Sequence, residues 1–306
     1  MTSILLIEQV LNGIGYGLML FLLAAGLTLV FGVMDVLNLA HGSLFMAGAY
    51  VAAQVHTASG SFALAVLAAM GLVALLAVAL ELLLVRRLYG RDHLAQVLAT
   101  FGVILVADDV VKIAFGPAPV MASAPAALSL PVEILPGLPY PSYRLLILGA
   151  GVAVALALYL LVNHTRLGML LRAGASNRAM AELMGVRVGQ VFSVVFLLGA
   201  ALAALAGALM GPLTAVQVGM GEEILIPSLV VLVIGGIGSV RGAFVAALLV
   251  GLVDTLGRAF VPGLLKGLVS PALAADLGPA LAQLATYALM ALVLAFRPAG
   301  LFPARG

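Results

Sequence analysis

The sequence of 306 residues contains no cysteine, which excludes disulfide cross-links, thiolate metal ligands and a cysteine nucleophile. It is also poor in charge, because 14 basic and 12 acidic residues make up only 8% of the chain. A soluble domain carries about 25% charged residues, and so few charges cannot cover a water-facing surface of this size. A soluble enzyme is therefore excluded. The net charge of +2 is too small to indicate a nucleic-acid partner.

Hydrophobic residues make up 64% of the chain, and the mean hydropathy of +1.27 indicates an integral membrane protein. The first apolar run has no Lys or Arg before it, so it lacks the basic region of a secretory signal peptide. We therefore expect residues 4–33 to form a retained transmembrane helix.

A helix that crosses the hydrocarbon core needs about 20 apolar residues. Long candidates occupy residues 11–33, 62–85, 94–115, 145–162, 191–213, 243–261 and 280–296. Two shorter segments, near residues 43–55 and 224–237, either borrow flanking residues to cross or enter the bilayer only part way. We predict an all-α polytopic membrane protein with eight or nine transmembrane helices, folded as a single domain over residues 1–306.

The basic residues predict how the chain is oriented, because cytoplasmic loops carry an excess of Lys and Arg. For nine crossings, most of them fall on one side, namely Arg86, Arg87, Arg91, Arg166, Arg172, Arg178, Arg187, Arg241, Arg297 and Arg305. The other side keeps Lys112, Arg144, Arg258 and Lys266. The first side is therefore predicted to be cytoplasmic and to hold the C-terminus, while the side of the N-terminus stays open.

Two loops and two stripes of small residues stand out. Residues 116–142 hold half of the 14 prolines, which predicts an extended external loop, and residues 164–190 form a basic cytoplasmic loop. Small residues recur every fourth position, which lets helix backbones approach closely and predicts a compact bundle. These stripes are Gly199, Ala203, Gly207 and Gly211, and then Ala243, Ala247 and Gly251.

Several catalytic and metal-binding motifs are missing. A phosphate-binding loop needs Gly-Lys-Ser/Thr, and neither Lys112 nor Lys266 follows a glycine, so this chain does not hydrolyse ATP. The zinc motif His-Glu-x-x-His does not occur, and the four histidines lie in separate regions, so no metal site is predicted.

Charged residues inside the spans offer one alternative function. An ion-coupled carrier needs an isolated carboxylate in mid-membrane, and Asp254 is the only candidate. Arg258 follows one helical turn later, a spacing that favours a structural ion pair. Asp108, Asp109 and Lys112 lie nearer the outer end of their span, where long side chains reach the headgroups.

Glycine-rich breaks beside the two short segments are typical of discontinuous helices, which expose backbone groups to a polar pathway in transporters. The candidate pathway residues are Asn38, His41, Gly42, Ser43, Gly235, Gly236, Gly238 and Ser239. Two ordinary tight turns, with Asn38 and Ser43 as helix caps, explain the same composition. Composition alone leaves both interpretations open.

The basic loop contains a well-formed helix signal. Ser176 or Asn177 is a suitable N-cap, residues 179–184 favour helix, and Gly185 suits the position after its end. This short helix presents an apolar face of Met180, Leu183 and Met184, surrounded by Arg172, Arg178 and Arg187. Such a helix lies on a membrane surface or docks into a groove on a partner protein.

Taken together, these segments resemble the inner-membrane permease subunits of branched-chain amino acid ABC importers. The most specific is GLTLVFGVMDVLNLAHGSLFMAGAY over residues 26–50, which is similar to the family's first-helix signature. RAGASNRAMAELMGV over residues 172–186 looks like its cytoplasmic coupling loop, with GAALAALAG following at 199–207. GGIGSVRGA at 235–243 and RPAGLF at 297–302 are also family-like.

The resemblance implies a permease, not an enzyme, in the bacterial inner membrane, with lipid around it and no cofactor of its own. Two separate ATPase subunits would bind ATP, and a second homologous permease and a periplasmic binding protein would complete the importer. Coupling to an ATPase subunit would involve Arg172, Asn177, Met180, Ala181, Glu182 and Gly185.

The resemblance leaves the substrate and the assembly partly open. Leucine, isoleucine and valine are the expected substrates, while relatives with similar signatures carry urea, short amides or other small organic molecules. The two permease positions are filled either by this chain twice or by this chain and a sister subunit.

Overall fold

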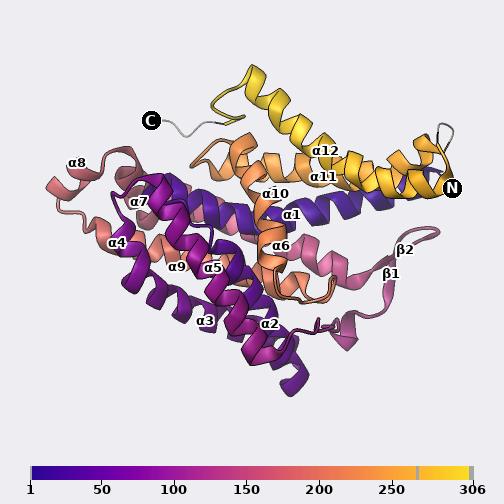
Figure 1. The fold of residues 1–306 in the computed structure, drawn as a ribbon, viewed down its shortest axis with the longest axis horizontal. Coiled ribbons are helices and arrows are strands. Elements are labelled where there is room, and N and C mark those ends of the chain that lie inside the picture. Colours follow the sequence, from indigo (N-terminus) through magenta and orange to yellow (C-terminus); the bar gives the residue numbers. More distant parts are fainter. Residues whose placement is uncertain (1, 267–268, 303–306) are drawn as a thin grey trace.

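A computed structural model describes residues 2–266 and 269–302, and helices account for most of them (Figure 1). In chain order the α-helices are α1 (Thr2–Met34), α2 (His41–Ser59), α3 (Phe62–Leu80), α4 (Arg86–Leu88), α5 (His93–Phe115), α6 (Ser142–His164), α7 (Arg166–Ser176), α8 (Arg178–Leu183), α9 (Val188–Met210), α10 (Met220–Gly235), α11 (Val240–Leu265) and α12 (Pro271–Phe296). A π-helical turn, Glu81–Val85, joins α3 to α4.

Helix α1 forms the centre of the bundle and packs against α11, α9, α10 and α6. Its middle, from Leu18 to Ala25, is almost wholly buried. Glycines let α11 approach the backbone of α1, since a Cβ atom added to Gly17 would lie 2.7 Å from the Ala247 carbonyl oxygen. The predicted small-residue stripes on α9 and α11 therefore lie at helix contacts, as expected for close packing.

Within the described residues, six helical segments are long and apolar enough to cross a membrane, namely Ile4–Met34, Phe62–Leu88, Ser142–His164, Val188–Met210, Val240–Leu265 and Pro271–Phe296. Each matches a predicted span. Helix α2 has 19 residues and borrows flanking residues, whereas α10 has 16 and spans about 24 Å. A total of eight or nine crossings therefore depends on α2, α5 and α10, and it stays a prediction.

The two unusual loops lie at opposite ends of the molecule (Figure 1). Helices α4, α7 and α8, which carry much of the basic charge, gather at one end, and the strands β1 and β2 lie with the N-terminus at the other. This separation is what the distribution of basic residues requires, although Arg305 lies outside the described residues. That the basic end faces the cytoplasm stays a prediction.

The proline-rich loop is largely extended, as predicted, but it also contains a β-hairpin that the all-α prediction did not include. Strand β1 (Pro131–Leu135) pairs antiparallel with β2 (Leu138–Pro141), and Gly137 turns the chain with φ of 82°. Proline is compatible with such an isolated two-stranded edge, where a missing N–H leaves no broken ladder. Elsewhere in the loop, Val120 exchanges two hydrogen bonds of 2.8 and 2.9 Å with Val216, which fixes the loop to the α9–α10 connection.

The basic loop holds two helices where the sequence predicts one. The additional helix α7 begins after Thr165, whose hydroxyl accepts a hydrogen bond of 3.1 Å from the Gly168 amide. It ends at Ser176, and α8 follows immediately after Asn177. The predicted helix at 179–184 is therefore found one residue earlier, and it is the outer part of a helical hairpin attached to α6.

We predict that Gly48→Ala destabilises the protein, because a Cβ atom at this position would lie 2.5 Å from the Ala204 Cα atom. Overpacking of this kind costs about 1–3 kcal/mol of unfolding free energy. Thermal unfolding in detergent measures the effect. Gly71→Ala in α3 is the control, since no atom lies within 4 Å of the added Cβ, and there the better helix propensity of alanine should stabilise. Equal shifts for both variants would contradict the prediction.

Candidate functional site

The first candidate site is the break between α1 and α2, residues 35–40. Helix α1 ends at Met34, and Asp35 turns the chain with φ of 53°, a conformation that is uncommon outside glycine. The backbone groups freed by the break are satisfied by α5. The Gln96 side chain accepts from the Leu37 amide at 3.0 Å and donates to the Asp35 carbonyl at 3.4 Å, and the Thr100 hydroxyl accepts from the Leu39 amide at 3.2 Å.

Gln96 and Thr100 are buried polar residues of this candidate site that the sequence analysis did not single out. Lipid offers no hydrogen bonds, so an irregular segment at membrane depth needs partners from the protein itself. The available signal was their spacing, since two polar residues four apart in an apolar span lie on one helix face. These side chains hold the break in place.

Three predicted pathway residues of this break are buried polar groups without satisfied bonds. The Asn38 amide, His41 Nε2 and Ser43 hydroxyl find no hydrogen-bond partner among residues 2–266 and 269–302. Ala40, not Asn38, occupies the N-cap of α2, so the interpretation of Asn38 and Ser43 as helix caps is wrong. Unsatisfied buried polar groups are costly, and they gather at functional sites more often than elsewhere.

The second break, between α10 and α11, is a tightly packed glycine turn. Gly236 and Gly238 have φ of 99° and 79°, and the Ser239 hydroxyl caps α11 by accepting from the Gly242 amide at 3.1 Å. The segment 299–302 covers this turn, because the Leu301 and Phe302 amides donate to the last carbonyls of α10 at 2.8 and 3.0 Å. The family-like C-terminal motif therefore has a packing role here.

The two breaks make glycine contacts near opposite ends of α10. Gly42 of α2 meets Gly221 at the start of α10, and Gly238 meets Gly32 near the end of α1, each at backbone contact. A space lined by Asn38, Leu229 and Leu232, among others, measures only about 10 Å³. The two breaks are thus linked through α1 and α10, and the space beside Asn38 is too small for an amino acid.

All of the predicted coupling residues except Arg172 lie in α8 or beside its two ends. The Asn177 side chain caps the helix by accepting from the Met180 amide at 2.9 Å, and Gly185 ends it with φ of 84°. Arg178 pairs with Glu182 along the exposed side at 3.2 Å, while Ala181 is buried against the bundle. Leu183 and Met184 are 82% and 79% exposed, and Met180 is also exposed. The apolar face predicted from the sequence is confirmed.

Arg172 plays a different part from the other predicted coupling residues. Its guanidinium donates to the Val162 carbonyl in the last turn of α6. This contact ties α7 to α6, so Arg172 positions the helical hairpin.

A chain of contacts links α8 to the end of α3. The Arg178 guanidinium lies 5.2 Å from the centre of the Phe192 ring, and the Tyr89 ring packs edge-on against Phe192 at 5.3 Å. The Tyr89 hydroxyl donates to Glu81 at 2.8 Å, and Arg86 makes two bonds of 3.3 and 3.2 Å to the same carboxylate. Burial, followed by the bond to Glu81, raises the pKa of Tyr89, which keeps this donor protonated.

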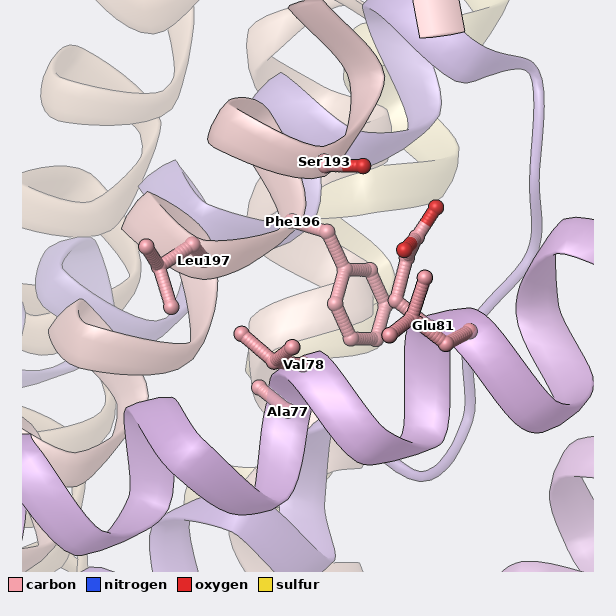
Figure 2. Close-up of a pocket in the computed structure, with 7 residues that line it drawn as sticks. Ala77, Val78, Glu81, Ser193, Phe196 and Leu197 are labelled. Atoms are coloured by element: carbon pink, nitrogen blue, oxygen red, sulfur yellow. The ribbon is translucent and has the colours of Figure 1, made fainter. Parts of the chain in front are cut away.

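Glu81 lies in the π-helical turn, where it faces a pocket of about 80 Å³ between α3 and α9. Figure 2 shows its carboxylate above α3 with the Phe196 ring beside it, and Ser193 on the facing helix. Arg86 also donates to the Ser193 hydroxyl at 3.3 Å, which adds a hydrogen bond between α4 and α9. The π turn therefore points a carboxylate toward the same helix, α9, that bears Phe192 and receives Arg178.

The charged pair in α11 is formed as the sequence predicts. The Arg258 guanidinium donates to the Asp254 carboxylate at 2.8 Å, and the Arg258 side chain is half exposed while Asp254 is buried. Over the described ranges, no three His, Asp or Glu side chains lie close enough together to hold a metal ion.

Comparison with known proteins identifies relatives over nearly the whole chain. A family model described as branched-chain amino acid transport system / permease component matches residues 9–296. The high-affinity branched-chain amino acid transport system permease protein BraD of Pseudomonas aeruginosa is 27% identical, over 96% of this chain and 95% of its own length. LivH of Escherichia coli K12 is 27% identical over 79% of this chain, and a probable LivH of Methanocaldococcus jannaschii is 29% identical over 78%. No solved structure matches the chain significantly.

We predict that Gln96→Leu loosens the break, because the Leu37 amide loses its acceptor and a buried donor without a partner costs about 1–3 kcal/mol. Hydrogen exchange of the peptide covering residues 35–40, followed by mass spectrometry, should become faster. Gln54→Leu is the control, since this glutamine of α2 is exposed. Unchanged exchange in Gln96→Leu would show that α5 does not hold the break.

Proposed function

The chain belongs to the family of permease components of branched-chain amino acid transport systems, and we propose that it imports leucine, isoleucine and valine as the membrane-spanning subunit of an ATP-driven importer. Permeases of this family are multi-pass membrane proteins that work within ABC transporter complexes and are not enzymes. The observation that carries the proposal is the exposed helix α8 at the basic end of the molecule. It fits a coupling role in a chain that lacks a phosphate-binding loop.

In this proposal the loop 164–190 is the cytoplasmic coupling loop, and α8 docks into a groove on a separate ATPase subunit. A short helix with exposed Leu183 and Met184 supplies the apolar anchors that such grooves bind. Its attachment supports this role, because contacts through Arg178, Phe192 and Tyr89 connect α8 to α9 and to the segment that follows α3. Two ATPase subunits would act on two permeases in the complete importer.

The space beside Asn38 is too small to hold an amino acid within one chain, which supports a pathway shared with a second permease. We propose that substrate passes between this chain and a homologous permease, close to the breaks at Asn38–Ser43 and Gly235–Ser239. A periplasmic binding protein would deliver it at the opposite end from α8, where the proline-rich loop 116–142 lies. Affinity purification in mild detergent tests the assembly, which should contain two P-loop ATPase polypeptides and a second permease.

The substrate proposal rests on the relatives, whose names specify branched-chain amino acid transport. At 27% identity the same framework also suits urea, short amides or other small organic molecules. Uptake by cells that express the complete importer distinguishes these substrates directly, with radiolabelled leucine, isoleucine, valine and urea measured in parallel.

We predict that Gly185→Arg and Glu182→Lys uncouple the importer without unfolding it. Both positions are exposed at the end of α8, and losing the surface pair between Arg178 and Glu182 costs at most about 1 kcal/mol. Leucine uptake should fall about tenfold or more, as when an interface anchor is lost, and less ATPase subunit should co-purify.

Gly60→Arg is the matched control for Gly185→Arg. Both glycines have positive φ and open space around a Cβ atom, but Gly60 lies in the α2–α3 turn. It carries the same backbone strain and the same new charge. Equal loss of co-purifying ATPase in both variants, or none in Gly185→Arg, would contradict the coupling role of α8.

Asp254→Asn distinguishes the importer from an ion-coupled carrier. In the importer Asp254 only pairs with Arg258, whose half-exposed side chain can reach the headgroups when the pair is lost. Leucine uptake per molecule in the membrane should therefore stay within about twofold of the wild type, even if less protein accumulates. Abolished uptake at normal membrane abundance would instead favour a carrier that uses this carboxylate.

A further inference from the structure

A second set of buried polar groups comes from α2, α5 and α10, and it begins beside the contact between Gly42 and Gly221. Tyr50 of α2 is only 1% exposed. Its hydroxyl, the Oδ1 atom of Asp108 on α5 and the Oε1 atom of Glu222 on α10 are all enclosed, and none has a hydrogen-bond partner in the part of the chain that the structure describes. Burying two carboxylate oxygens and a phenol hydroxyl without hydrogen-bond partners costs folding free energy inside a membrane protein.

Asp108 lies within electrostatic range of the other two groups. Asp108 interacts with both the Tyr50 hydroxyl and the Glu222 carboxylate. The helices are held in register nearby, since the Tyr50 ring stacks on Phe115 of α5 at 4.9 Å and Gly42 of α2 touches the residue before Glu222. Side chains from three separate helices thus converge on one place.

The neighbouring charges leave this place negative. Lys112 is the nearest cation to Asp108 on α5, and its ammonium bonds to the exposed carboxylate of Asp109 at 3.2 Å. Glu223, beside Glu222, is exposed and adds further negative charge. The enclosed oxygens of Asp108 and Glu222 are therefore suited to bind a positive group that can donate hydrogen bonds.

Their position is at the end of the molecule that bears the proline-rich loop. Val120 pairs with Val216 in the connection that leads into α10, so the loop lies over the start of the helix that carries Glu222. In the proposed importer this is the side from which substrate arrives. An amino acid entering there carries an ammonium group with three donors, and the two carboxylates and the phenol offer three acceptors.

We propose that Asp108, Glu222 and Tyr50 receive the α-ammonium group of an amino acid substrate as it enters the permease. This site rests on the proposed function and deepens it, because it favours a substrate with a primary ammonium group over urea, amides or organic anions. While substrate is bound, the enclosed carboxylate oxygens accept charge-assisted hydrogen bonds that they lack in the empty permease. The bound ammonium is then released toward the breaks.

The test measures initial uptake of radiolabelled leucine in cells that lack their own copy of this subunit but retain the rest of the importer. Asp108→Asn and Glu222→Gln should lower the uptake rate about tenfold or more, because each removes a charge-assisted acceptor. Tyr50→Phe should lower it about threefold, as expected for one neutral hydrogen bond. Asp108→Glu, which restores the carboxylate, should recover much of the rate.

The chain supplies matched controls at adjacent positions. Asp109→Asn and Glu223→Gln make the same charge change on the exposed neighbours, and each should leave uptake within about twofold of the wild type. ATP hydrolysis by the purified complex separates a substrate contact from a structural role. Asp108→Asn should keep the hydrolysis that the binding protein stimulates, while less leucine moves per ATP.

Normal uptake in Asp108→Asn and Glu222→Gln, or equal losses in the controls, would overturn the ammonium site and leave the proposed function intact. A parallel loss of ATP hydrolysis and uptake in the variants would likewise overturn it, because that outcome indicates a structural role. Failure of the proposed function is recognised differently, since the wild type itself would then show no ATP-dependent uptake of leucine.

Discussion

Backbone contact between glycines is the constraint on which the rest of this structure depends. Gly42 meets Gly221, Gly32 meets Gly238, and Gly17 lies against the α11 backbone, so the helices around α1 approach more closely than any side chain would allow. In lipid, where apolar surface gains little by leaving one apolar medium for another, such close packing is a main source of helix association. It also places the second break against the end of α1 and leaves a space of only about 10 Å³ beside Asn38.

The backbone amides freed at the first break are hydrogen-bonded by a helix that is distant in sequence. Gln96 and Thr100 satisfy backbone amides that lipid cannot, and Asp108 follows them on the same helix at multiples of four residues. The same helix therefore supports the break at one level and carries Asp108 at another. A movement of α5 would change both together, which connects substrate arrival with the conformation of the break in physical terms.

At the other end of the molecule, a small number of side-chain contacts likewise attaches α8 to the bundle. A short helix of six residues has little stability of its own, so it depends on its cap at Asn177 and on the packing of Ala181. Arg178 then joins it to Phe192, and the carboxylate of Glu81 orders Tyr89 and Arg86 beneath them. These contacts attach α8 to the bundle through Arg178 and Ala181 and leave its apolar residues exposed to a partner.

Composition and periodicity alone determined that this chain is a helical membrane protein, where its long spans lie, that a short helix begins after Ser176 or Asn177 and ends before Gly185, and that Asp254 is spaced to pair with Arg258. These features are local, since they depend on hydrophobicity and on residues within a turn or two of each other. Only the tertiary structure decided that α7 joins α8, that Pro131–Pro141 forms a hairpin, and that Gln96 and Thr100 support a break some 60 residues away. It alone brought Tyr50, Asp108 and Glu222 together, because no sequence spacing encodes which faces of three separate helices meet when their backbones pack.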